Sequence, residues 1–117
     1  MSEDDSIVFE PGDIVFGDDP FNSATAAQPW CIIANHDDRP FHGDQYIALT
    51  LTTKSWHDGL IAIESADWVR GGTPKDSRIV PWGVQSIAHE DIDYWQGRLQ
   101  QERVAAAVAA LEDIIRI

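Results

Sequence analysis

Gln28-Pro29-Trp30-Cys31-Ile32-Ile33-Ala34-Asn35 is the stretch around which the chain is organised. Pro29 has no backbone N–H and pushes the residue before it into an extended conformation, so the start of the stretch reads as the entry of a strand. From Trp30 to Ala34 both alternating sets of side chains are apolar, and such a strand is buried on both faces or lies between a core and a partner. We therefore expect a central strand of a small β-barrel, with any chemistry beside its entry and exit.

Length and composition predict one domain spanning residues 1–117. Hydrophobic residues make up 44% of the 117, which suits a single globular core. No apolar run approaches the roughly 20 residues of a membrane span. Residues 1–6 are acidic rather than signal-like and are expected to be disordered, so we expect a cytoplasmic protein.

The formal net charge of −12 admits two interpretations. An ordinary acidic surface would repel nucleic acid. The acidic residues are mostly Asp, however, and the only lysines are Lys54 and Lys75, a bias that favours adaptation to a cytoplasm at molar salt. There the Debye length falls to about 3 Å, so net charge does not forbid binding to a polyanion.

The rest of the chain predicts short strands and a terminal helix. Residues 101–115 form the helix, because Val104, Val108, Leu111 and Ile115 make one apolar stripe that packs on the body. Pro81 and Gly83 imply an edge or a bulge in one strand. The strands are expected at 13–16, 45–53, 59–63, 79–87 and 94–99, with a helical turn or tight loop at 65–69 and a helical turn at 89–92. This order favours a mainly β small barrel or strongly bent sheet with a C-terminal α-helix.

The strand at 45–53 shows the clearest alternation. Ile47, Leu49 and Leu51 face one way and belong in the core. The opposite set, Tyr46, Ala48, Thr50 and Thr52, would line a cleft or an interface, or meet water.

Metal and thiol chemistry find little support. His36, His42, His57 and Asp44 lack metal-site spacing on a regular element, so no metal is expected. Cys31 is the only cysteine and is expected to be a buried, inert thiol. Among the tryptophans, Trp30, Trp68 and Trp82 are expected to be buried, whereas Trp56 in a turn is the best candidate for a partner contact.

Two features point to phosphate chemistry. Thr50 and Thr52 lie on one strand face, and the segment 70–78 carries Arg70, Lys75 and Arg78 with only one acidic residue. Hydroxyls and cations beside a cleft suit phosphoryl transfer on RNA, where the 2′-OH is the internal nucleophile and the protein positions groups and stabilises charge. A solvated strand face with a basic loop is the alternative.

The chain resembles the PemK/MazF/Kid family of growth-inhibiting toxins. The resemblance runs through Pro11–Val15, Gln28–Asn35, Ile47–Thr52, Asp76–Ile79 and Gln85–Ile87 to the C-terminal helix, and rests on their order and spacing. The acidic composition looks haloarchaeal.

The resemblance implies a Src-homology-3-like barrel that dimerises and cleaves single-stranded RNA selectively by sequence. It implies no cofactor, a cyclic phosphate and a 5′-hydroxyl as products, and inhibition by a cognate antitoxin. The family pairs an Arg at the strand entry with a Thr at the end of the next strand, which Thr52 matches here.

The strand entry departs from the family pattern because Gln28 stands where the Arg is expected. An amide supplies hydrogen bonds but no charge. Arg39 or His42, from the loop that leaves the central strand, would replace the cation by folding back, and His42 suits proton transfer near neutral pH. The predicted catalytic set is therefore Gln28, Thr52, Arg39 and His42, with Thr50, Arg70, Lys75 and Arg78 binding RNA phosphates. The alternatives are a barrel that only binds an antitoxin, RNA or another protein, and a structural homodimer.

Overall fold

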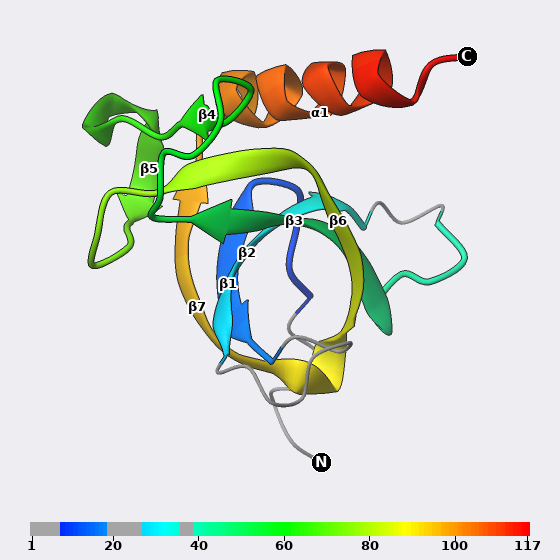
Figure 1. The fold of residues 1–117 in the computed structure, drawn as a ribbon. Helices are drawn as coiled ribbons and strands as arrows, with labels where there is room; N and C mark the ends of the chain where they lie inside the picture. The colour runs from blue at the N-terminus through cyan, green and yellow to red at the C-terminus, as the bar shows by residue number, and fades with distance from the viewer. Residues whose placement is uncertain (1–7, 19–26, 36–38) are drawn as a thin grey trace.

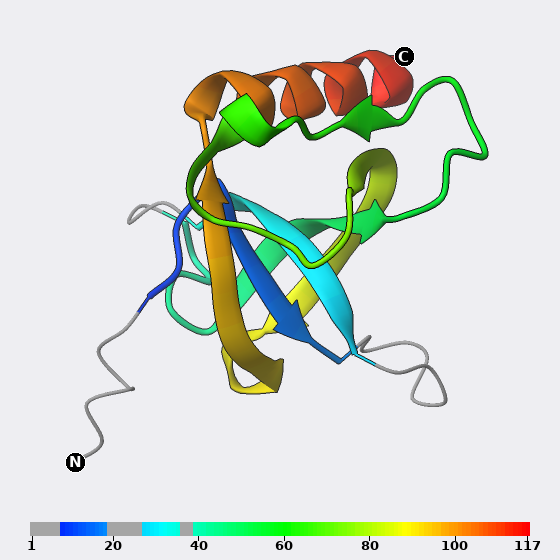
Figure 2. The same cartoon turned by 90° about the vertical axis from the view of Figure 1, so that its left-hand side faces the viewer.

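The computed structural model describes residues 8–18, 27–35 and 39–117, which form one curled antiparallel sheet and a terminal helix. The seven strands lie in the order β4-β6-β3-β2-β1-β7-β5. Figure 1 looks along the curl, with α1 lying across its outside, and Figure 2 shows the same arrangement from the side. The mainly β fold with a C-terminal helix is confirmed. The elements are β1 Asp13–Gly17, β2 Gln28–Ala34, β3 Gln45–Thr52, β4 Ile61–Ala62, the 3₁₀ helix Ser65–Asp67, β5 Trp68–Gly71, β6 Arg78–Ala88, the 3₁₀ helix His89–Asp91, β7 Ile92–Leu99 and α1 Gln101–Ile115.

Strand β2 lies at the middle of the sheet, between β1 and β3, and contributes to two cores. Trp30 and Ile32 join the core inside the curl, together with Val15, Tyr46, Ala48 and Ile87. Cys31, on the opposite face of β2, joins the core under α1 with Ile14, Leu49, Leu51, Ile79, Leu99, Val104 and Ala107. The expectation of a strand buried on both faces is confirmed. Strand β3 is buried on both faces at its centre, since Ala48 and Leu49 are both fully buried. Tyr46 and Ala48 therefore lie in the core inside the curl and not at a cleft or in water.

The predicted irregularity at Pro81 and Gly83 is present in β6. The register between β3 and β6 shifts between Leu49 and Leu51, so the β6 chain makes a bulge there. A Cβ at Gly83 would lie 3.0 Å from Cβ of Thr50. Glycine is therefore required where the bulge presses on β3.

A buried carboxylate fastens β1 to β7. Asp13 is only 2% exposed. Its Oδ1 accepts hydrogen bonds from Trp95 Nε1 at 3.0 Å and Arg98 Nε at 2.9 Å. Its Oδ2 accepts from the backbone N–H of Glu10 at 2.7 Å and from Arg98 Nη2 at 3.3 Å. Four donors thus satisfy a charge that would otherwise be costly to bury.

Some local predictions are wrong. Trp82 was expected in the core but is 37% exposed, because it lies on the bulge of β6 rather than in a regular pair. Ile115 ends the helical stripe beyond the body and is exposed. Strand β5 was not expected as a strand. The predictions for residues 1–6 and for His36 concern positions outside the described residues.

No helix in the described part of the chain is both long and apolar enough to cross a membrane. The buried Cys31 matches its prediction. Burial, reinforced by the charge of Asp13, raises the pKa of this thiol to about 12.

Candidate active site

Three polar side chains from three adjacent strands form a row at one end of the sheet. Thr52 lies directly opposite Arg78 in the pairing of β3 with β6. Trp30 lies opposite Thr50, and continuing that antiparallel register by two residues sets Gln28 opposite Thr52. Directly opposed residues point to the same face, and adjacent strands lie about 4.8 Å apart. The row Gln28–Thr52–Arg78 therefore spans about 10 Å on the inner face of the curl.

The cation of the row has no counter-ion among the described residues. Arg78 is half-buried, and its guanidinium forms no ion pair with any residue in the described ranges. The chain has 20 acidic residues against 8 lysines and arginines, so an unpaired, partly desolvated arginine is unexpected. A guanidinium in this state is suited to a planar, bidentate contact with a phosphate.

Lys54 adds a second cation beside Thr52. Its backbone N–H donates to Thr52 Oγ1 at 3.1 Å. The Thr52 hydroxyl therefore accepts from the backbone and keeps its own proton to donate. The Lys54 side chain is exposed and forms no ion pair within the described ranges. Lys54 was not predicted as a site residue from the sequence. That it is one of only two lysines in an acidic chain could have singled it out.

Thr50 is engaged in holding the neighbouring bulge. Its Oγ1 donates to the carbonyl oxygen of Gly83 at 3.1 Å. The side chain is half-buried on the same face as the row. Its hydroxyl oxygen still has acceptor capacity, but its proton is committed to β6.

Arg39 and His42 lie at the opposite end of the strands. The turn that carries them joins the end of β2 to the start of β3, and the backbone N–H of His42 donates to the carbonyl of Arg39 at 3.1 Å. Strand β2 runs six residue steps from Gln28 to Ala34, which is about 20 Å. Figure 1 shows this turn on the right and the arrowhead of β3 on the left. Within one chain these residues are not brought to the row.

The other two cations of the basic segment are separate from each other. Arg70 is exposed in β5, at the far edge of the sheet order, with its guanidinium carbon 6.0 Å from the centroid of the Trp95 ring. Lys75 is exposed beside a polar cavity of about 310 Å³ that Thr73 and Ser77 also line. Of the three basic residues predicted to bind phosphate, the fold brings only Arg78 to Thr52.

The remaining predicted site residue, Trp56, is 56% exposed in the loop between β3 and β4. Within the described ranges, no group of three or more His, Cys, Asp or Glu side chains is placed to hold a metal ion. The chemistry available at the row consists of hydrogen-bond donors, two cations and a hydroxyl.

Comparison with solved structures identifies the fold. The chain is similar to a mycobacterial endoribonuclease solved in complex with its cognate antitoxin (TM-score 0.68, 17% identity, 91% of each chain covered). It is also similar to a second mycobacterial endoribonuclease structure (TM-score 0.70, 17% identity, 92% of this chain and 90% of that chain). A chain of the MazE–MazF complex from Deinococcus radiodurans gives a TM-score of 0.70 at 11% identity, covering 95% of this chain and 98% of that chain.

The curled sheet with its C-terminal helix is thus the fold of MazF toxins. No protein-family model matches the sequence. No curated protein matches it either.

Proposed function

We propose that this protein is the toxin of a type II toxin–antitoxin pair, an endoribonuclease that cleaves single-stranded RNA at selected sequences without a metal ion. The observation that carries the proposal is Arg78, which lies directly opposite Thr52 at one end of a sheet with the MazF fold and forms no ion pair with any described residue. An arginine left unpaired in so acidic a chain is explained by an anionic substrate.

The reaction we propose is transfer of the phosphate to the neighbouring ribose oxygen. The 2′-oxygen attacks phosphorus and loses its proton, the bond to the 5′-oxygen breaks, and that oxygen leaves as a 5′-hydroxyl after gaining a proton. The products are a 2′,3′-cyclic phosphate and a 5′-hydroxyl end. Water carries both protons, because the row holds no group that titrates near neutral pH.

Each residue of the row has a distinct part in this proposal. Arg78 stabilises the charge that grows on the non-bridging phosphate oxygens, where fixed donors are most effective. Thr52 donates its free hydroxyl proton to one of those oxygens, and the Gln28 amide donates to another. Lys54 holds the adjacent phosphate, and Thr50 keeps β6, and with it Arg78, in register.

The cleavage experiment uses the full chain and a long RNA in EDTA, at 0.15 M and at 2 M KCl. We expect cuts at defined sites with 5′-hydroxyl ends, which polynucleotide kinase labels directly. Thr52→Ala abolishes them, whereas Thr53→Ala, the exposed neighbour outside the row, does not. A single 2′-deoxy substitution at the cut site protects that site, because it removes the nucleophile. RNA that stays intact across several substrates contradicts the proposal, and RNA that is bound but uncut favours a binding module.

We further propose a homodimer inhibited by a cognate antitoxin in the cytoplasm. Strand β6 pairs with β4 only at Arg78 and Ile79, so its outer edge beyond them meets no other strand of the described chain. Val84 on this stretch is exposed. An open edge with an apolar residue suits a second copy. Sedimentation of the wild type as a monomer at micromolar concentration contradicts the dimer, and a small neighbouring reading frame whose product blocks cleavage supports the antitoxin.

Adaptation to high salt, and with it a haloarchaeal origin, stays a proposal that rests on composition. Dialysis from molar KCl to low salt is expected to reduce the far-UV circular dichroism of the protein, as carboxylate repulsion is unscreened. Full structure at low salt contradicts it.

A further inference from the structure

Three aromatic rings gather on the surface of the protein. Trp56 and His57 come from the loop between β3 and β4, and Trp82 comes from the bulge of β6. The ring centroids are 5.8 Å apart for Trp56–His57 and for Trp56–Trp82, and 4.9 Å apart for His57–Trp82. All three pairs meet at 72–73°, so no two rings cover each other in parallel. Ring faces therefore remain for a planar ligand, and neither tryptophan is buried.

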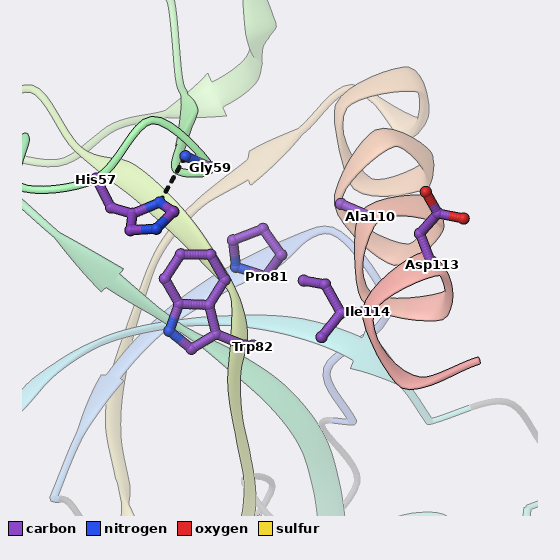
Figure 3. A pocket seen from close by; sticks show the side chains of 7 residues that line it. All are labelled: His57, Gly59, Pro81, Trp82, Ala110, Asp113 and Ile114. Carbon is purple, nitrogen blue, oxygen red and sulfur yellow. Dashed lines mark hydrogen bonds between the residues drawn. The ribbon is translucent and has the colours of Figure 1, made fainter. Parts of the chain in front are cut away.

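The arrangement is fixed by the loop itself. The backbone N–H of Gly59 donates to His57 Nδ1 at 2.8 Å, as Figure 3 shows, which places the proton of the neutral ring on Nε2. A Cβ at Gly59 would lie 3.0 Å from the Trp82 ring. Only glycine lets the loop approach Trp82 this closely. The imidazole therefore offers an outward-facing donor at a set position beside the two indoles.

A groove of about 540 Å³ lies between α1 and two of these rings, those of His57 and Trp82. Its walls include Pro81, Ala110 and Ile114, and Figure 3 shows Ile114 directed toward Pro81 and Trp82. The carboxylate of Asp113 lies on the other side of the helix in that view and pairs with Arg116. The walls of the groove are therefore mainly apolar, although Asp113 also lines it.

The rings follow the end of the proposed active site closely along the chain. Trp56 follows Thr52 by four residues, so their Cα atoms lie within about 14 Å of each other. Lys54 lies between them, with an exposed ammonium that forms no ion pair in the described ranges. A cation followed by exposed aromatic rings is the combination that holds single-stranded nucleic acid, the cation at the backbone and the rings against the bases.

We propose that Trp56, His57 and Trp82 form a base-stacking platform for single-stranded RNA, with Lys54 holding the phosphate between the platform and Thr52. The inference deepens the proposed nuclease function and rests on it. The base stacks on an indole, and the His57 Nε2–H donates to a base carbonyl or to a phosphate oxygen. The platform gives the enzyme a contact with a nucleotide flanking the cut, and hence part of its sequence preference.

The test measures the affinity of the full chain for a labelled 12-nucleotide RNA by fluorescence anisotropy, over a series of KCl concentrations. The RNA carries 2′-O-methyl groups throughout, so it cannot be cut. Trp56→Ala is expected to weaken binding by about 5- to 100-fold, the effect of losing one stacked base. It leaves the slope of log affinity against log salt unchanged, whereas Lys54→Gln reduces that slope by about 0.7. Trp56→Phe restores most of the affinity.

A second experiment tests whether the Trp56 ring and one particular base interact. An abasic site is moved along the RNA one position at a time. At the stacked position it weakens wild-type binding, and there Trp56→Ala has no further effect, which shows that ring and base act together. Tyr94→Ala is the matched control, since Tyr94 is 52% exposed on β7 and stacks on Phe16 instead.

Three outcomes overturn the platform. One is an RNA affinity that neither Trp56→Ala nor Trp82→Ala changes while the wild type cleaves RNA, in which case the nuclease proposal stands without the platform. The second is unchanged affinity with altered sedimentation, which assigns the rings to a contact between copies. The third is a wild type that neither binds nor cleaves RNA, which removes the nuclease proposal and the platform with it.

Discussion

Arg98 and Arg78 belong to the same sheet but have opposite surroundings. Arg98 Nε lies 2.9 Å from Asp13 Oδ1, and its Nη2 lies 3.3 Å from Glu10 Oε2. The hydrogen bond and charge of Asp13 raise the pKa of Arg98. Arg78 lies opposite Thr52 with no ion pair in the described chain. The first cation is neutralised within the fold and fastens β1 to β7, whereas the second is left for an anion from outside.

Removing the unpaired cation is expected to have the largest effect. Arg78→Gln reduces cleavage by about 10²- to 10³-fold, because the transition state loses a charged donor. The melting temperature changes by less than about 4 °C, since no ion pair is broken. Single-turnover kinetics measure the cleavage rate, and thermal unfolding measures the melting temperature. Arg70→Gln, which removes an exposed arginine from β5 at the far edge of the sheet order, is the control. Equal rates for Arg78→Gln and wild type contradict the assignment.

Breaking the Asp13–Arg98 ion pair is expected to lower the stability of the fold, which the loss of Arg78 leaves nearly unchanged. Asp13→Ala strands Arg98, Trp95 Nε1 and the Glu10 N–H, and it is expected to cost about 3 kcal/mol, the low end for a buried pair because water reaches Arg98. The melting temperature falls by about 10 °C. Glu10→Gln, the exposed partner of the same arginine, costs less than about 1 kcal/mol. Denaturant titration measures both, and equal losses show that burial of Asp13 is not what strengthens the pair.

Adding a cation to the row at position 28 tests whether this position lies beside the reacting phosphate. Gln28→Arg is expected to raise cleavage by about ten-fold, since a charge-assisted donor replaces an amide two strands from Arg78. Gln45→Arg, an exposed glutamine at the other end of β3, leaves the rate unchanged. If Gln28→Arg does not raise the rate, Gln28 is not beside the reacting phosphate.

What the sequence predicted was mainly local. The helix at 101–115 follows from one apolar stripe. The bulge of β6 follows from Pro81, which cannot donate to a ladder, and from Gly83, since a glycine inside a strand often marks a bulge. The exposure of Trp82 was missed because composition favours burial of tryptophan, whereas the bulge turns this one outward. The row depends on pairing between residues 28, 52 and 78, which is set by register across three strands and not by any local pattern. Arg39 and His42 were expected to fold back to the strand entry, but the length of β2, about 20 Å, keeps the two ends of the strand apart.

The reactivity of two thiols, the native Cys31 in the core and a cysteine introduced in the row, compares how accessible the two regions are. Cys31 lies in the core under α1, and its pKa of about 12 keeps it protonated. In the folded state it is expected not to react with a thiol reagent up to pH 9, and to react once guanidinium unfolds the chain. Because its folded pKa lies above its ordinary value of 9.0, the neutral thiol contributes stability below pH 9 that is lost as the pH rises toward 12.

Thr52→Cys adds a thiol between Arg78 and Lys54, where cations favour the thiolate and solvent has access. It is therefore expected to react within minutes at pH 7.5, while Cys31 does not react. Equal reaction rates for the two thiols mean that the row is as closed as the core, and an anionic substrate then has no route to Arg78.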